Sequence, residues 1–180
     1  MKKVVIVIGH RTKKQGAYSP YLGESEYSYM EKVAYYLQDI VDVYQRPNTL
    51  FVSETTRINQ MVNTINKQKY DLVLSLHFNS FHDRKAHGAT ALHYITNSRT
   101  KQIANQFIKL VSESFSVKKR SLIPVTSTKE RGGVFVIKTK ADAVLLEPFF
   151  GSNLEDAIKF KNKHEEYANT IKALITKYCQ

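Results

Sequence analysis

What the sequence lacks excludes several classes of protein. It contains one cysteine, Cys179, among 180 residues, so no internal disulfide can form. Its apolar runs, such as Val4–Ile8, are far shorter than the roughly 20 residues that a membrane-spanning helix needs. The apolar stretch after the basic start at Lys2 and Lys3 is also too short for a secretory signal. We therefore expect neither a disulfide scaffold nor a chain with a transmembrane segment or export signal.

The rest of the composition is that of a folded globular domain. Hydrophobic residues make up 42% of the chain and charged residues 24%, which is ordinary for such proteins and argues against disorder. The chain is long enough to bury a core, since a domain of about 150 residues hides roughly 70% of its unfolded surface. No repeat, low-complexity tract or linker stands out. We expect a single domain over residues 1–180.

Acidic residues are scarce relative to basic ones. The chain has 16 Asp and Glu against 27 Lys and Arg, which gives a net charge of +11. Such a charge attracts polyanions, namely nucleic acid, anionic lipid or an anionic cell-wall polymer, and it does not choose among them. The densest basic cluster, Lys118-Lys119-Arg120, is most simply a solvated loop.

Apolar runs typical of strands alternate with helical periodicity, which indicates an α/β domain. We expect about six strands, at residues 3–8, 49–53, 71–76, 88–95, 133–137 and 143–146. We expect four main helices. The first runs from a cap at Ser25 to about Tyr44, the second follows a cap at Thr55 or Thr56, the third covers residues 103–115, and a long last helix carries Phe160 to Tyr178. Residues 117–130 are expected to form a loop.

Three of the predicted strands end in residues that can do chemistry. His10 follows the first strand, His77 follows the strand at residues 71–76, and Glu147 follows the strand at residues 143–146. Sites in open α/β sheets form at the carboxyl ends of parallel strands. If these strands are parallel neighbours, the three side chains meet at one edge of the sheet.

A second carboxylate joins this group. Glu26 lies four residues before Met30 and seven before Val33, so it shares the buried stripe of the first helix. Two histidines and one carboxylate are a standard ligand set of catalytic zinc, which keeps one position open for water. The alternatives are histidines hydrogen-bonded at strand ends and a carboxylate favoured by the helix dipole. Glu24 competes with Glu26 as the third ligand.

Five pieces of the sequence, in order, resemble one enzyme family. They are residues 5–10 (VIVIGH), 23–26 (GESE), 70–79 (YDLVLSLHFN), Gly88 with Tyr94, and residues 143–153 (AVLLEPFFGSN). By these pieces the chain resembles the zinc-dependent N-acetylmuramoyl-L-alanine amidases of the Amidase_3 type, which cleave peptidoglycan. The resemblance covers nearly the whole chain. It implies one α/β domain with a twisted mixed sheet of about six strands, flanked by helices on both faces.

The resemblance also implies roles for particular residues. His10, Glu26 and His77 would hold one Zn²⁺ ion, and Glu147 would be the catalytic carboxylate. Asn79 and Arg131 are candidates for substrate contact, although a loop amide and a surface charge are as plausible. The substrate would be peptidoglycan, cut at the amide between N-acetylmuramic acid and the L-alanine of the stem peptide. Many relatives have Asp-Pro-Gly-His-Gly where this chain has Val7-Ile8-Gly9-His10-Arg11.

We expect a phage-type lysin, made in the cytoplasm and acting on the cell wall after release, with its positive charge binding anionic envelope polymers. One alternative is another zinc hydrolase on a similar scaffold, such as a peptidase or a deacetylase. The other alternative is a basic nucleic-acid-binding module without catalysis. No aromatic and basic RNA-binding pattern or basic recognition helix supports that alternative, so we expect no nucleic-acid partner.

Overall fold

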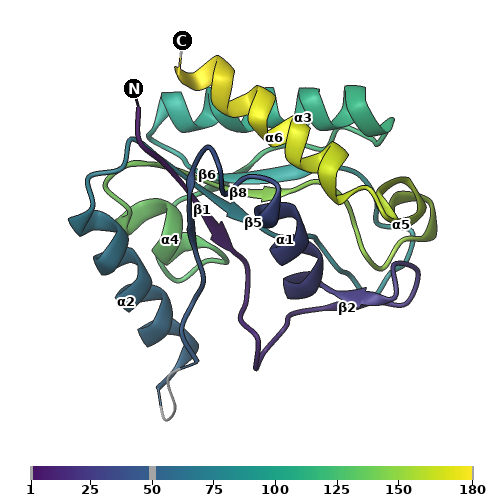
Figure 1. Cartoon of the computed structure of the whole chain (residues 1–180), viewed down its shortest axis with the longest axis horizontal. Helices are drawn as coiled ribbons and strands as arrows, with labels where there is room; N and C mark the ends of the chain where they lie inside the picture. Colours follow the sequence, from purple (N-terminus) through teal and green to yellow (C-terminus); the bar gives the residue numbers. More distant parts are fainter. Residues whose placement is uncertain (1, 49–51, 180) are drawn as a thin grey trace.

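The computed structural model, which describes residues 2–48 and 52–179, is built on one six-stranded sheet (Figure 1). The strands lie in the order β4 (Asp42–Tyr44), β1 (Val4–Ile8), β5 (Leu72–Leu76), β8 (Asp142–Glu147), β6 (Thr90–Tyr94) and β7 (Ile123–Val125). β4, β1, β5 and β8 run parallel to one another, whereas β6 is antiparallel to β8. A short hairpin of β2 (Tyr18–Ser19) and β3 (Glu24–Ser25) lies outside the sheet.

Helices cover both faces of this sheet. One face packs against α1 (Glu26–Tyr35), α3 (Ser98–Phe115) and α6 (His164–Cys179), and the other against α2 (Glu54–Lys67) and α4 (Gly133–Lys138). Side chains alternate along β1, so that Ile6 and Ile8 enter the first core while Val5 and Val7 enter the second. The short helix α5 (Leu154–Phe160) precedes α6. The predicted fold class, a mixed α/β sheet with helices on both faces, is confirmed. Within the described residues, no helix has the length and apolar character that crossing a membrane requires.

The strand predicted at residues 133–137 is wrong, because these residues form the helix α4. A short continuous apolar run fits a buried helix as well as a buried strand. Gly132, with φ of 72°, is the N-cap of the helix. Phe135 and Val136 pack into the core shared with α2. The edge of the sheet beside β6 is formed by β7, which lies in the segment predicted to be a loop. Pro124 is tolerated in β7 because it is an edge strand.

The first helix is shorter than predicted. α1 ends at Tyr35, and after a series of turns the chain forms β4, which pairs in parallel with β1. Leu37 and Val41 are still buried, so they contribute to the core without being helical, and the helical spacing of these residues was misleading. The strand predicted at residues 49–53 falls partly outside the described residues, and Val52 and Ser53 are not in a strand.

The predicted caps and the predicted last helix are partly correct. Ser25 caps α1, as expected, but α2 is capped by Ser53 and not by Thr55 or Thr56. The long last helix is divided into α5 and α6. The break lies at Asn162, whose φ of 60° is left-handed and ends helical geometry. Phe160 nevertheless remains fully buried.

Candidate metal centre

The carboxyl ends of three neighbouring parallel strands form the base of the site. β1 pairs with β5 and β5 with β8, so that Ile8, Leu76 and Leu146 lie side by side. The next residues continue this alignment, since the N–H of Gly9 donates to the carbonyl of Leu76 and that of His77 donates to the carbonyl of Leu146. His10, His77 and Glu147 therefore arrive at the same edge of the sheet.

Glu26 reaches this edge from the side. It is the first residue of α1, directly after the cap Ser25, whose hydroxyl accepts from the N–H of Ser28. The N–H of Glu26 donates to the carbonyl of Ala17, which ties the start of the helix to the preceding loop. The side chain is only 6% exposed, and it points away from solvent toward the two histidines.

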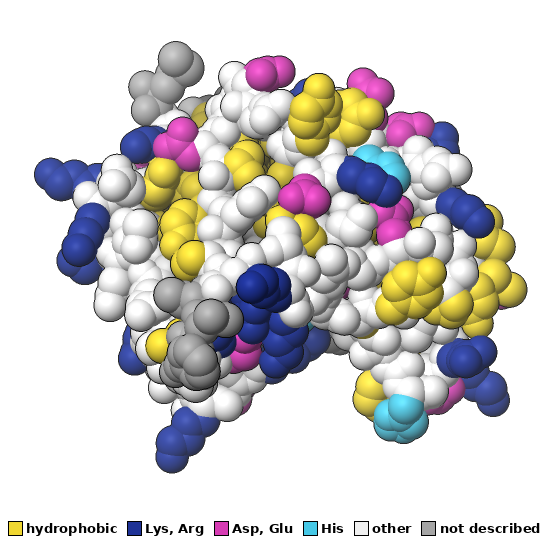
Figure 2. All heavy atoms as spheres, turned by 60° about the horizontal axis from the view of Figure 1, so that its bottom comes forward, with side chains coloured by type: hydrophobic (Ala, Val, Ile, Leu, Met, Phe, Trp, Pro, Cys, Tyr) yellow, Lys and Arg dark blue, Asp and Glu magenta, His cyan; other side chains and the backbone are white. Residues whose placement is uncertain are grey.

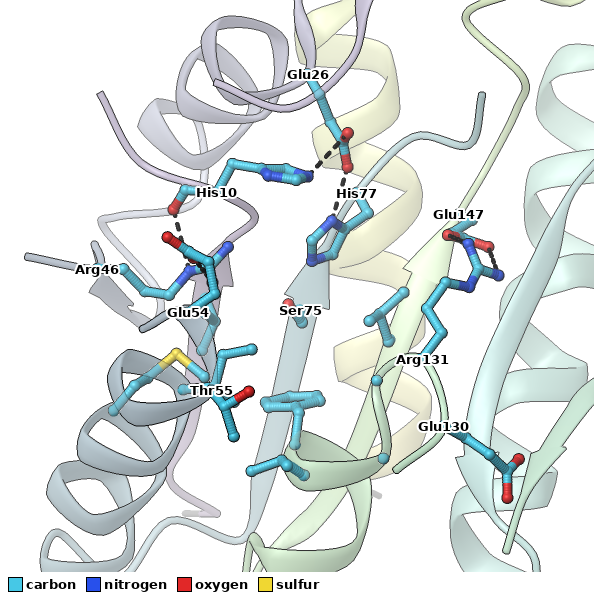
Figure 3. A pocket seen from close by; sticks show the side chains of 18 of the residues that line it. His10, Glu26, Arg46, Glu54, Thr55, Ser75, His77, Glu130, Arg131 and Glu147 are labelled. Carbon is cyan, nitrogen blue, oxygen red and sulfur yellow. Dashed lines mark hydrogen bonds and ion pairs between the residues drawn. The ribbon is translucent and has the colours of Figure 1, made fainter. Parts of the chain in front are cut away.

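His10, Glu26 and His77 point toward one another (Figure 3). Nε2 of His10 lies 3.0 Å from one carboxylate oxygen of Glu26, and Nδ1 of His77 lies 2.7 Å from the other. The two imidazole rings meet edge to face, with their centres 5.3 Å apart. One donor atom from each residue lies within 4.8 Å of the other two.

Gly16 leaves room for this trio. Its φ is +76°, and a Cβ added to it would lie 2.5 Å from Cδ2 of His10 and 2.6 Å from Oε2 of Glu26. Real Cβ atoms do not approach other atoms so closely, so any side chain here would displace His10 and Glu26. Glycine is thus required at this position by the site as well as by the backbone.

The protonation states of Glu26 and His77 suit a metal ion. Burial raises the pKa of Glu26, but hydrogen bonds from His10 and His77 outweigh it and lower that pKa to about 2. Burial lowers the pKa of His77, which Glu26 only partly offsets. An ionised carboxylate and a neutral imidazole are the forms in which these side chains bind metal.

The donor set fits zinc. Zinc accepts histidine nitrogens at about 2.0–2.1 Å and carboxylate oxygens at about 2.0–2.2 Å, and its catalytic sites have three protein ligands. Here two nitrogens and one carboxylate already converge from separate elements, and small side-chain movements would place them around one ion. Among the described residues, this is the one group of three such side chains that could hold a metal.

Glu147 lies near the trio and has partners of its own. Arg131 donates to both of its carboxylate oxygens, at 2.7 and 3.0 Å, and the side-chain amide of Asn79 donates to one of them at 3.0 Å. Burial raises the pKa of Glu147 to about 7, although the charge of Arg131 acts in the opposite direction. A buried carboxyl group that titrates near neutrality is typical of a general acid or base.

A cleft of about 900 Å³ connects these groups. It contains the trio, Glu147, Asn79 and Arg131, and it extends between α2 and α4. Part of its lining is apolar, formed by Val7, Ile58, Met61, Phe135 and Leu145. All six residues that the sequence singled out therefore lie in one cleft. Asn79 and Arg131, for which we predict contact with substrate, both hydrogen-bond to Glu147.

Glu24, the alternative to Glu26 as third metal ligand, points away from the site. Glu24 pairs with Lys32 and His164, so it is not directed at the two histidines. Sequence reasoning missed Gly16, Arg46 and Glu54, which line or support the cleft. The sequence offered no signal for the two charged residues, because their ion-pair and hydrogen-bond partners come from distant segments.

The chain was compared with known proteins. The sequence profile of the family Amidase_3, N-acetylmuramoyl-L-alanine amidase, matches residues 4–177. No curated protein matches the sequence.

Solved structures share the fold. The catalytic domain of the CD27L endolysin that targets Clostridia difficile is 24% identical, with a TM-score of 0.82 over 98% of each chain. The catalytic domain of the amidase CwlV from Bacillus (Paenibacillus) polymyxa var. colistinus is 23% identical, with a TM-score of 0.78 over 99% of this chain and 98% of that one. The amidase AmiC2 of Nostoc punctiforme is 19% identical, with a TM-score of 0.75 over 100% of this chain and 98% of that one.

The family match spans all six strands of the sheet and every residue of the cleft. The protein belongs to the N-acetylmuramoyl-L-alanine amidase family.

Proposed function

We propose that this chain is a zinc-dependent amidase that cleaves the bond between N-acetylmuramic acid and the L-alanine of the peptidoglycan stem peptide. The observation that carries the proposal is the convergence of His10, Glu26 and His77 in an open cleft beside the buried Glu147. The trio would hold the ion, and family membership supplies the bond that is cut.

Zinc, when bound, would polarise the carbonyl of the scissile amide and lower the pKa of a water molecule toward about 7. The chain's own residues do the rest. Glu147 accepts a proton from the attacking water and passes it to the departing amine. Arg131 and Asn79 fix the orientation of the Glu147 carboxylate through three hydrogen bonds.

Digestion of purified peptidoglycan followed by mass spectrometry tests the bond that is cut. We expect intact stem peptides with a new N-terminal alanine, and we expect Glu147→Gln to lower their yield by at least about a hundredfold, as loss of a general base typically does. Cleavage within the stem peptide would indicate a peptidase, and release of acetate alone a deacetylase. Either product would contradict the proposal.

If His10, Glu26 and His77 hold zinc, substitution of Gly16 by alanine should disturb the metal site. We expect Gly16→Ala to weaken zinc binding by at least about tenfold, because the added Cβ displaces His10 and Glu26. Gly23→Ala is the matched control, since Gly23 also has a positive φ, +79°, but has no atom within 4 Å of an added Cβ. Competition with a chelator measures both affinities. Equal zinc binding by the two variants would show that the trio does not hold the ion.

The pairing of Arg131 with Glu147 sets an expected pH dependence. Glu147 must be ionised to accept a proton, so activity rises with pH through its pKa. Burial raises this pKa and Arg131 lowers it, so Arg131→Met should raise it and shift the acid limb of kcat/KM to higher pH by about one unit. Arg131→Lys, which keeps the charge, should shift the limb less. If kcat/KM fell in both variants with the limb unmoved, Arg131 would act on the substrate instead.

We further propose that the protein acts as a phage-type lysin, made in the cytoplasm and reaching the wall after release. The fold shared with the catalytic domain of the CD27L endolysin supports this proposal. The net charge of +11 would bind it to anionic envelope polymers. Basic side chains lie at the left, right and lower edges and near the centre of the face in Figure 2, and acidic ones lie mainly in its upper half.

This charge makes lysis sensitive to salt. We expect the lysis of whole cell walls to fall steeply as ionic strength rises above roughly 0.1 M, where screening is strong. Cleavage of a small soluble muramyl peptide should change little over the same range, which serves as the control. If lysis of cell walls does not depend on salt, the charge has no role in binding them.

A further inference from the structure

We propose that Glu54 is a positioning residue for the metal centre, and that it acts through Arg46 to hold His10 in the orientation in which it binds zinc. This inference rests on the proposed function, because it assumes that His10 is a zinc ligand. Glu54 and Arg46 line the same cleft (Figure 3). Neither residue is one of the three proposed zinc ligands, and neither pairs with Glu147.

His10 needs support that the other two ligands do not. Glu26 is the first residue of a helix, and His77 directly follows a central strand. His10 lies in the loop after β1, its φ is +64°, and its side chain is 29% exposed against 16% for His77. A left-handed backbone is unfavourable for histidine, so interactions with the surroundings must maintain it.

Arg46 provides such an interaction. Its Nε donates to the backbone carbonyl of His10 at 3.1 Å, and its side chain is only 8% exposed. The neighbouring residues are also fixed, since Gly9 bonds to Leu76 while Arg11 and Lys14 form a backbone bridge. The guanidinium of Arg46 thus fixes the carbonyl at the centre of the left-handed turn.

Glu54 in turn holds Arg46. One carboxylate oxygen of Glu54 lies 3.7 Å from a terminal nitrogen of Arg46, and the other lies 3.0 Å from Arg11 and 3.2 Å from Arg57. Glu54 is in the first turn of α2, directly after the cap Ser53, where the helix dipole also favours a negative charge. The helix therefore presents a fixed carboxylate to the turn that carries His10.

The charges around Glu54 explain why it matters. Three guanidinium groups share this one carboxylate, and Arg11 and Arg57 each repel Arg46. If Glu54 lost its charge, Arg46 would lose the largest attraction that offsets this repulsion, and it would move toward solvent. The carbonyl of His10 would then lose its donor, and the turn would relax away from the zinc-binding geometry.

The test measures zinc affinity by competition with a chelator, for the wild-type protein, Glu54→Gln, Arg46→Met and the double variant. Removal of a group that orients a metal ligand typically weakens binding 10–100-fold, so we expect a loss of about tenfold or more in each single variant. Because Glu54 acts through Arg46, the two losses should not add. The zinc affinity of the double variant should equal that of the single variant with the lower affinity.

Asp142→Asn is the matched control. Asp142 also accepts from several partners, namely Asn97, Arg99 and Tyr178, and it is the first residue of β8, whereas Glu147 is the last. We expect it to lower the melting temperature of the metal-free protein and to leave zinc affinity unchanged. If Glu54→Gln does not fold, Glu54→Asp keeps the charge but moves it by one methylene, and it should weaken zinc binding by less than Arg46→Met.

The outcomes separate this inference from the proposed function. If Glu54→Gln lowers the melting temperature but binds zinc as the wild type does, Glu54 is merely structural and the inference fails. Additive losses in the double variant would also overturn it, because the two residues would then act separately. A wild-type protein that binds no zinc would refute the metal centre itself.

Discussion

The site depends on one buried carboxylate between two imidazoles. An isolated carboxylate taken out of water is strongly destabilised unless it finds cations or hydrogen-bond donors. Glu26 finds hydrogen-bonding partners, because His10 and His77 each approach one of its oxygens. This requirement explains why the loop before α1 carries Gly16 and why Ser25 fixes the start of that helix. It also explains why β1 and β5 end side by side at one edge of the sheet. Each of these features brings the three side chains together.

Glu26 and Glu147 share the cleft and have opposite environments. Glu26 is stabilised as an anion, with its pKa lowered to about 2, whereas burial raises the pKa of Glu147 to about 7. Carboxylates whose pKa values are driven apart commonly divide roles, one staying ionised and the other exchanging protons. In this cleft the permanently ionised group suits a metal ligand and the titrating group suits proton transfer. Arg131 keeps the second group ionised over a wider pH range than burial alone would allow.

The sequence predicted three strands at the centre of the sheet, namely β1, β5 and β8. Each is a mainly apolar run that is followed by a residue able to do chemistry. Residues 133–137 failed because a short apolar run has no period that separates a strand from a helix. β4 failed because Leu37 and Val41 keep helical spacing although the chain has left the helix. The edge strands pair with neighbours distant in the chain, and that pairing leaves no local signal.

The amino-acid sequence by itself determined that the chain is one α/β domain, and it singled out His10, Glu26, His77 and Glu147, which lie in the cleft. It did so because strand ends and a helix stripe are local patterns with known directions in space. Only the tertiary structure decided that Arg131 pairs with Glu147, that Glu24 is turned away toward Lys32 and His164, and that Glu54 and Arg46 support His10. The physical reason is that a buried charge is stabilised by partners from distant segments, and their approach is fixed by how helices pack on the sheet.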